Sequence, residues 1–209
     1  VAVGYNSLST NTLGNRNVAI GTGALATLNQ TTATDSNNTA VGQAAGYAIT
    51  TGINNVFIGM GAGDAQTTAN QNVAVGKDSL TSNVAGAKNV AIGTAAMANF
   101  NNTAADTYNT CVGDHAGSAL TTGTYNTIIG GVAGDALTDS DYNVAIGYNA
   151  LTTDTLGLRS IAIGYEALMT QNFSTATTSL NTAVGYQAGH DITTGTNNTL
   201  IGYQTGEKL

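Results

Sequence analysis

The sequence predicts an all-β protein, a parallel β-solenoid (β-roll) of about twelve 17-residue coils with longer loops every fourth coil. Three observations lead to this prediction: a short repeat with a fixed period, a β-branched residue before the glycine of each repeat, and a shortage of large core side chains. The 209 residues include three Phe, three Met and no Trp. The interior therefore has to be narrow and filled by small side chains.

The repeat is centred on a glycine that follows two small or apolar residues. Successive glycines are 17, 21, 17, 17, 17, 20, 17, 17, 17, 21 and 17 residues apart. A short fixed period is typical of a solenoid, in which each coil gains stability by stacking on its neighbours. We interpret residues 1–209 as a single repeat domain and as a segment of a longer fibre. Its twelve coils lie around Gly4, Gly21, Gly42, Gly59, Gly76, Gly93, Gly113, Gly130, Gly147, Gly164, Gly185 and Gly202.

The three residues before each glycine predict a short strand. The residue directly before the glycine is always Val or Ile, the one before that is usually Ala, and the first is Val, Thr or Ile. This alternation indicates a strand with two unequal faces. We expect the Val and Ile side chains to point into a thin, dry interior. The glycine itself allows a corner or a close backbone approach that a Cβ atom would block.

An asparagine four residues before the glycine recurs in ten of the eleven units that have this position, and Ser160 replaces it in the remaining unit. Asparagine tolerates left-handed backbone and bonds nearby backbone groups, which suits the turn before the strand. In stacked coils these residues predict a structural ladder of side-chain amides. The alternative interpretation is a row of ligand-binding amides. The ladder comprises Asn17, Asn38, Asn55, Asn72, Asn89, Asn109, Asn126, Asn143, Asn181 and Asn198.

Several units resemble known repeats. The stretches "NVAIGTGAL", "NVAIGYNAL", "SIAIGYEAL" and "NTAVGYQAG" resemble the repeats of trimeric autotransporter adhesin heads, which stack into a left-handed parallel β-roll. They are more similar still to the N-T-A-V-G-Y-Q-A-L units of phage and bacterial tail-fibre-like proteins. The resemblance spans all twelve units. It implies a homotrimeric, rod-like fibre segment that is extracellular, on a cell surface or part of a virion, and it brings no catalytic motif.

Composition argues against several classes of function. The five Lys and Arg residues are scattered singly in a chain of net charge −7, so we expect no nucleic-acid partner. No apolar run approaches the roughly 18 residues of a membrane helix, so we expect no membrane insertion. Asp64 and Asp135 share one register but offer single carboxylates, and His115 and His190 occupy different registers. We predict no metal site, no cofactor, no catalytic residue and no enzymatic activity, and we interpret Cys111 as a small buried side chain.

Two sets of residues are candidates for the surface. Five tyrosines directly follow a repeat glycine, so stacked coils place several of them on one face, where they contact glycans or pack at a chain interface. These are Tyr5, Tyr148, Tyr165, Tyr186 and Tyr203. In the inserted loops, Asn29, Asn101 and Asn172 each begin an Asn-x-Ser/Thr sequon and are possible glycosylation sites.

These features predict a structural fibre or filament segment that extends, presents its loops and adheres to surface glycans. Its expected partners are copies of itself, as a homotrimer or a filament, and cell-surface glycans. One alternative is a polysaccharide-processing, tailspike-like protein, which needs acidic pairs facing one groove. Another is an ice-binding solenoid that uses the pairs Thr50–Thr51, Thr121–Thr122 and Thr193–Thr194.

Overall fold

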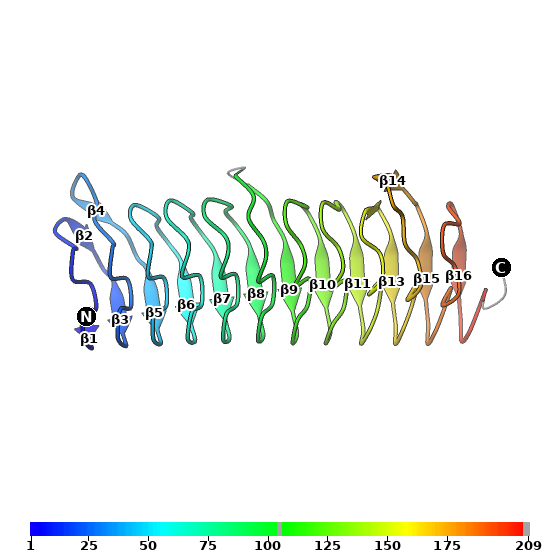
Figure 1. Ribbon diagram of the computed structural model, residues 1–209, viewed down its shortest axis with the longest axis horizontal. Coiled ribbons are helices and arrows are strands. Elements are labelled where there is room, and N and C mark those ends of the chain that lie inside the picture. Colours follow the sequence, from blue (N-terminus) through cyan, green and yellow to red (C-terminus); the bar gives the residue numbers. More distant parts are fainter. Residues whose placement is uncertain (104–105, 207–209) are drawn as a thin grey trace. The chain divides into compact units, whose positions relative to one another are not determined.

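The computed structural model describes residues 1–103 and 106–206. All regular secondary structure in these residues is β-strand, and none of them is helical. The chain divides into two compact units, Val1–Thr107 (unit 1) and Tyr108–Leu209 (unit 2) (Figure 1). In each unit six parallel strands end directly before repeat glycines. The predicted fold class, a parallel β-solenoid of about twelve 17-residue coils, is confirmed.

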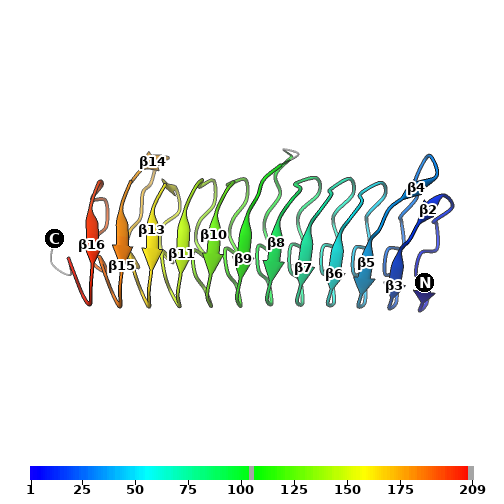
Figure 2. The ribbon, with the colours of Figure 1, turned by 180° about the vertical axis from the view of Figure 1, so that it is seen from behind.

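The strands of each unit pair in chain order, and Figures 1 and 2 show them side by side within their unit. Like positions of the repeat lie opposite each other: Ala40 pairs with Ala19 on one side and with Phe57 on the other. The sequence repeat thus becomes a repeat in space. Unit 1 contains β1 (Ala2–Val3), β3 (Val18–Ile20), β5 (Thr39–Val41), β6 (Val56–Ile58), β7 (Val73–Val75) and β8 (Val90–Ile92). Unit 2 contains β9 (Thr110–Val112), β10 (Thr127–Ile129), β11 (Val144–Ile146), β13 (Ile161–Ile163), β15 (Thr182–Val184) and β16 (Thr199–Ile201).

The inserted loops carry short strands of their own. In unit 1, β2 (Gly14–Asn15) pairs in parallel with β4 (Thr34–Asp35), and in unit 2, β12 (Gly157–Leu158) pairs with β14 (Thr177–Thr178). The remaining insertion lies between these two loops in the sequence, and there a parallel bridge joins Ala87 to Asp106. Figure 1 shows the loops that carry β4 and β14 extending beyond the turns of neighbouring coils in their own units. Each insertion therefore enlarges one coil without interrupting the main strands.

The expectation that Val and Ile line the interior is wrong. The central residue of each three-residue strand is buried and its two neighbours face outward: Phe57 is fully buried, whereas Ile58 is 40% exposed and Ile92 is 37% exposed. Alternation in a strand separates two faces but does not say which face is inside. The ladder asparagine lies two residues before the central residue and shares its face. Asn72 and Ala74 are accordingly both buried.

The core is completed from the turn that follows each glycine. Four residues after the glycine of its coil, Leu80 is fully buried, and so is Ala74, the central strand residue of the same coil. Where the residue at this turn position is glycine, the space that a side chain would fill is taken by a larger central strand residue of the same coil or of the next one. A Cβ atom on Gly46 would lie 2.6 Å from the ring of Phe57 in the next coil. Large side chains therefore enter the narrow core from the strand, from this turn position, and from the position seven residues after the glycine, where Leu28, Ile49 and Phe100 are fully buried.

The repeat glycines are required by both conformation and space. Their φ angles lie between +128° and +140°, and a Cβ atom on Gly76 would lie 2.4 Å from the carbonyl oxygen of Gly93 in the next coil. The second and fourth residues after each glycine are left-handed in every coil, even where they are Asp78 (φ 54°) and Leu80 (φ 52°). This conformation costs a non-glycine residue about 1 kcal/mol. At Leu80 the burial of the side chain offsets that cost.

Candidate functional site

The asparagine ladder is an internal column that joins successive coils. In unit 1 the amide oxygen of Asn38 accepts a hydrogen bond from the backbone N–H of Asn55 at 2.9 Å, and the amide oxygen of Asn55 accepts one from Asn72 at 2.9 Å. In unit 2, Asn109 accepts in the same way from Asn126 at 2.9 Å. Because the amides are buried and bonded within the solenoid, a ligand outside the coil does not reach them.

The side-chain N–H groups of the ladder are also bonded, except at Asn17, whose side-chain nitrogen is buried without a hydrogen-bond partner among the residues that the structure describes. The Asn55 amide donates to the carbonyl of Ala69 in its own coil at 2.9 Å and to the amide oxygen of Asn38 at 3.1 Å. Ser160, the exception in the sequence, keeps the backbone bond, since its N–H donates to Asn143 at 2.9 Å. Its hydroxyl pairs with that of Ser179 at 2.5 Å. The column is therefore adapted at the coil where the third loop is inserted.

Four of the five candidate tyrosines form one continuous ring stack in unit 2, which we call the first tyrosine stack. The ring centroids are 5.8 Å apart for Tyr148 and Tyr165, 5.1 Å for Tyr165 and Tyr186, and 5.4 Å for Tyr186 and Tyr203, and the rings lie within 16° of parallel. Tyr5 is exposed in unit 1. It does not share this stack because the next coils have Thr22 and Gln43 at its position.

A second tyrosine stack in unit 2 was not predicted. Tyr108, Tyr125 and Tyr142 lie directly before ladder asparagines, and their centroids are 5.5 and 5.1 Å apart. The guanidinium of Arg159, at the same position of the following coil, lies 5.6 Å from the Tyr142 centroid. The signal in the sequence was a tyrosine recurring five residues before three successive repeat glycines. Residues at this position are left-handed, with φ of 58° at Tyr125.

Stacking decides which surfaces of these tyrosines are accessible. Tyr165 and Tyr186 each have a tyrosine on both sides, so their ring faces are occupied, while the side chains remain 40% and 44% exposed. The groups that solvent reaches are the ring edges and the hydroxyls. Recognition of sugars by aromatic side chains uses ring faces, so inner members of the stack are poorly suited to it.

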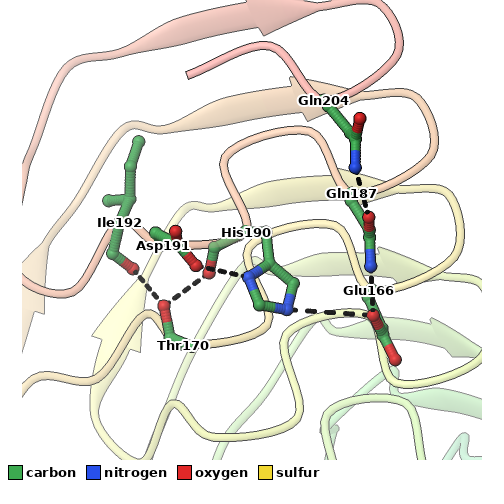
Figure 3. A network of polar contacts seen from close by, with 7 residues as sticks. All are labelled: Glu166, Thr170, Gln187, His190, Asp191, Ile192 and Gln204. Atoms are coloured by element: carbon green, nitrogen blue, oxygen red, sulfur yellow. Dashed lines mark hydrogen bonds and ion pairs between the residues drawn. The ribbon is translucent and has the colours of Figure 1, made fainter. Parts of the chain in front are cut away.

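A polar network is built around Glu166, the residue that follows Tyr165 of the first tyrosine stack in the sequence, and Figure 3 shows its members. Gln204 donates to the amide oxygen of Gln187 at 2.9 Å, and Gln187 donates to Glu166 at 2.8 Å. His190 Nε2 lies 3.8 Å from Glu166, and Nδ1 lies 2.5 Å from Asp191. The hydrogen bond from Gln187, together with the neighbouring Tyr165 and His190, lowers the pKa of Glu166. Glu166 is therefore ionised at neutral pH.

The same network does not form a nucleophilic site. The hydroxyl of Thr170 donates to the backbone carbonyls of His190 at 2.5 Å and Ile192 at 3.2 Å, and not to the imidazole (Figure 3). Glu166 and Asp191 approach the same imidazole from its two nitrogens. The ring therefore separates the two carboxylates. Glu166 also acts on the tyrosine before it in the sequence, since its carboxylate raises the pKa of the Tyr165 phenol.

The acidic residues of the repeat connect coils. Asp64 accepts a hydrogen bond from the hydroxyl of Thr81, and Asp135 accepts one from Thr152, in each case from the next coil. Asp141 accepts from the backbone N–H of Thr124 at 2.7 Å. In residues 1–103 and 106–206 no group of three His, Cys, Asp or Glu side chains is placed to hold a metal ion. These carboxylates act as hydrogen-bonding links between coils.

The remaining candidates have the following positions. The three sequon asparagines, Asn29, Asn101 and Asn172, are exposed. Cys111 is buried in the core, as expected. The hydroxyl of Thr50, in the first of the threonine pairs proposed for ice binding, donates to a backbone carbonyl at 3.2 Å. This bond reduces its availability for ordering water.

Two further findings concern membrane insertion and similarity to known proteins. The part of the chain that the structure describes contains no helix that could cross a bilayer. No family model, curated protein or solved structure matches the sequence.

Proposed function

We propose that this chain is a structural segment of a fibre or filament, in which copies pack against one another through the outer face of their strands. This outer strand face consists of the residues one and three positions before each repeat glycine. In unit 1 its apolar members include Val18, Ile20, Val41, Val56, Ile58, Val73, Val75, Val90 and Ile92. In unit 2 they include Val112, Ile129, Val144, Ile146, Ile161, Ile163, Val184 and Ile201.

The observation that carries the proposal is that this apolar face is bare. Parallel sheets are normally covered on both faces, but here Ile20 and Ile58 are each 40% exposed and Ile129 is 37% exposed. None of the twelve strands before the repeat glycines contains a charged residue. Within each unit, an uncharged apolar strip across six strands marks an interaction site on the protein surface.

A second copy of the chain is the partner that fits this face best. Stacked coils repeat at the inter-strand spacing of about 4.8 Å, so the ridges of Val and Ile are matched by a surface with the same repeat. Uncharged β-branched side chains pack well against other β-branched side chains. The resemblance to adhesin heads and tail fibres implies a homotrimer, in an extracellular, cell-surface or virion setting, and we include both in the proposal.

Size-exclusion chromatography with light scattering tests the proposal. The unchanged chain is expected to elute as a trimer or a larger assembly, while Ile58→Asp and Ile129→Asp place a charge on the outer strand face and yield monomers. Ala33→Asp, which adds the same charge at an exposed loop residue, is the control and leaves the assembly intact. An unchanged chain that is monomeric at all concentrations overturns the proposal.

Adhesion to surface glycans is a second proposed function, and the inserted loops are better placed for it than the first tyrosine stack. They present exposed side chains such as Asn101 and Thr103, whereas the faces of the inner tyrosines are covered. A glycan array tests this: binding should be weakened by Asn101→Ala and Thr103→Ala and retained by Tyr186→Phe. Failure to bind any glycan, or loss of binding only in the tyrosine variant, contradicts it.

The tailspike alternative receives less support from the geometry. Such an enzyme cleaves polysaccharide between two carboxyl groups, and the carboxylates of Glu166 and Asp191 are separated by the imidazole that both contact. A depolymerisation assay on capsular polysaccharide distinguishes the two functions. We expect no shortening of the polymer, and shortening that is lost in Glu166→Gln would favour the enzyme.

A further inference from the structure

The first tyrosine stack brings together side chains that one-electron oxidants attack. The chain contains no Trp, and its single cysteine is buried, so phenols are the most readily oxidised groups on its surface by this route. Tyr148 and Tyr165 lie on successive coils with centroids 5.8 Å apart. They are 54% and 40% exposed. Oxidants in solution therefore reach both rings.

Phenols oxidised in this way couple to each other. Each tyrosine loses one electron and its phenolic proton, and the resulting radical has spin density on the ring carbons next to the oxygen. Two radicals join through a bond between these carbons, and each displaced ring hydrogen moves to a phenolic oxygen, which restores two phenols. If a peroxidase is the oxidant, the two electrons and two protons released reduce one hydrogen peroxide to two waters. The product is dityrosine.

The structure favours coupling between neighbours in the stack. The rings are held side by side, so two radicals meet at the high effective concentration of an intramolecular reaction. Their exposed edges have room to turn about the bond from the ring to Cβ.

We propose that the first tyrosine stack is a site of oxidative cross-linking, at which peroxide-driven one-electron oxidation joins Tyr148 to Tyr165, and the following tyrosines to one another, as dityrosine. The bond ties successive coils of unit 2 together covalently. Like a disulfide, it restricts the unfolded chain. The proposal goes beyond self-association and does not depend on it, since both tyrosines belong to one chain.

The pattern of tryptic cleavage makes the test specific. Tyr148 lies in the peptide 89–159, which ends at Arg159, and Tyr165 lies in the peptide 160–208. The folded chain is treated at low concentration with hydrogen peroxide and a haem peroxidase, then unfolded, digested and analysed by mass spectrometry. We expect these two peptides to appear joined, two hydrogen masses below their sum, with fragmentation placing the bond between Tyr148 and Tyr165.

Two variants complete the design. Tyr148→Phe keeps an aromatic ring in the stack and should abolish the joined pair, while linkage within peptide 160–208 persists. Tyr142→Phe makes the same change in the second tyrosine stack, on the same peptide, and should leave the joined pair in place. The proposal is overturned if dityrosine forms only between chains, if it does not form while free tyrosine couples in the same mixture, or if Tyr148→Phe leaves the joined pair unchanged.

Discussion

The ring of Phe57 occupies the space that a side chain on Gly63 would need: a Cβ atom on this glycine would lie 2.5 Å from ring carbons Cδ1 and Cε1. Both residues belong to the coil around Gly59. In the next coil Ala74 replaces the phenylalanine and Leu80 replaces the glycine, and both are fully buried. The two positions therefore share one volume of the core.

This shared volume predicts non-additive substitutions. Phe57→Ala leaves a cavity and should lower the free energy of unfolding by about 3–5 kcal/mol, and Gly63→Leu should be destabilising because of the clash. The double variant adopts the arrangement of Ala74 and Leu80, so it should be more stable than the sum of the single effects by at least about 1 kcal/mol. Urea unfolding measures the three values, and strict additivity would contradict the shared space.

The asparagine ladder predicts a cost for removing a single amide. Asn55→Ala leaves the buried N–H of Asn72 without its acceptor, so the free energy of unfolding should fall by about 1–3 kcal/mol. Asn101→Ala, at an exposed loop position, is the matched control and should change stability by less than about 0.5 kcal/mol. Equal effects of the two substitutions in thermal unfolding would show that the ladder is not stabilising.

Asp154 predicts a pH-dependent stability. Its side chain is fully buried and accepts a hydrogen bond from the backbone N–H of Gly157 at 3.0 Å. Asn11 and Asn83 occupy the same position of the repeat, and each accepts an equivalent bond from a backbone N–H of its own loop. Burial raises the pKa of Asp154 despite its hydrogen bonds. An acid with a raised pKa in the folded state adds stability below its unfolded value of about 3.9 and loses that contribution as the pH rises through the folded value.

The variant Asp154→Asn isolates this contribution. It should be more stable than the unchanged chain at neutral pH, and the difference should shrink as the pH falls below about 4, where the carboxyl becomes protonated in both states. Unfolding in urea at a series of pH values measures the difference between the two proteins, so other carboxylates cancel. A difference that grows toward acid pH would reverse the sign and refute the assignment.

Cys111 predicts a thiol that reacts only on opening of the fold. It is fully buried at the centre of β9, and burial raises the pKa of its thiol far above the ordinary value. An opening that costs about 3 kcal/mol makes modification by a disulfide reagent about a hundredfold slower than in the unfolded chain. Absorbance of the released thiolate gives both rates. Comparable rates in buffer and in urea would place the thiol at the surface.

The sequons predict a pattern of modification. Asn29, Asn101 and Asn172 are all exposed, so in a secretory pathway that modifies asparagine each should carry one glycan. Asn37 and Asn197 also begin exposed Asn-x-Thr sequons, so the intact mass is compared between variants: each Asn→Gln substitution at Asn29, Asn101 or Asn172 should remove the mass of one glycan. Only the polypeptide mass, found in a host that glycosylates a control protein, would contradict the prediction.

Much of the fold was predictable because the repeat is regular. The spacing of glycines such as Gly76 and Gly93 predicted one coil per repeat, and the residues before them predicted a parallel strand in each coil. The first tyrosine stack was also foreseen as a face, since Tyr165 and Tyr186 share one register. The polar network around Glu166 was not foreseen, because Gln187 and His190 meet it only when a neighbouring coil is in place.

By itself, the sequence determined the period, the strand positions and the alignment of like residues, because a chain that repeats every 17 residues stacks each residue on its equivalent. Only the tertiary structure decided which face of the strand is inside. Phe57 and Ile58 are adjacent apolar residues in one strand, so the alternating pattern does not show which face of the strand is buried. The buried space beside Gly46 and Gly63 accepts the ring of Phe57, which leaves Ile58 and its equivalents on the outside.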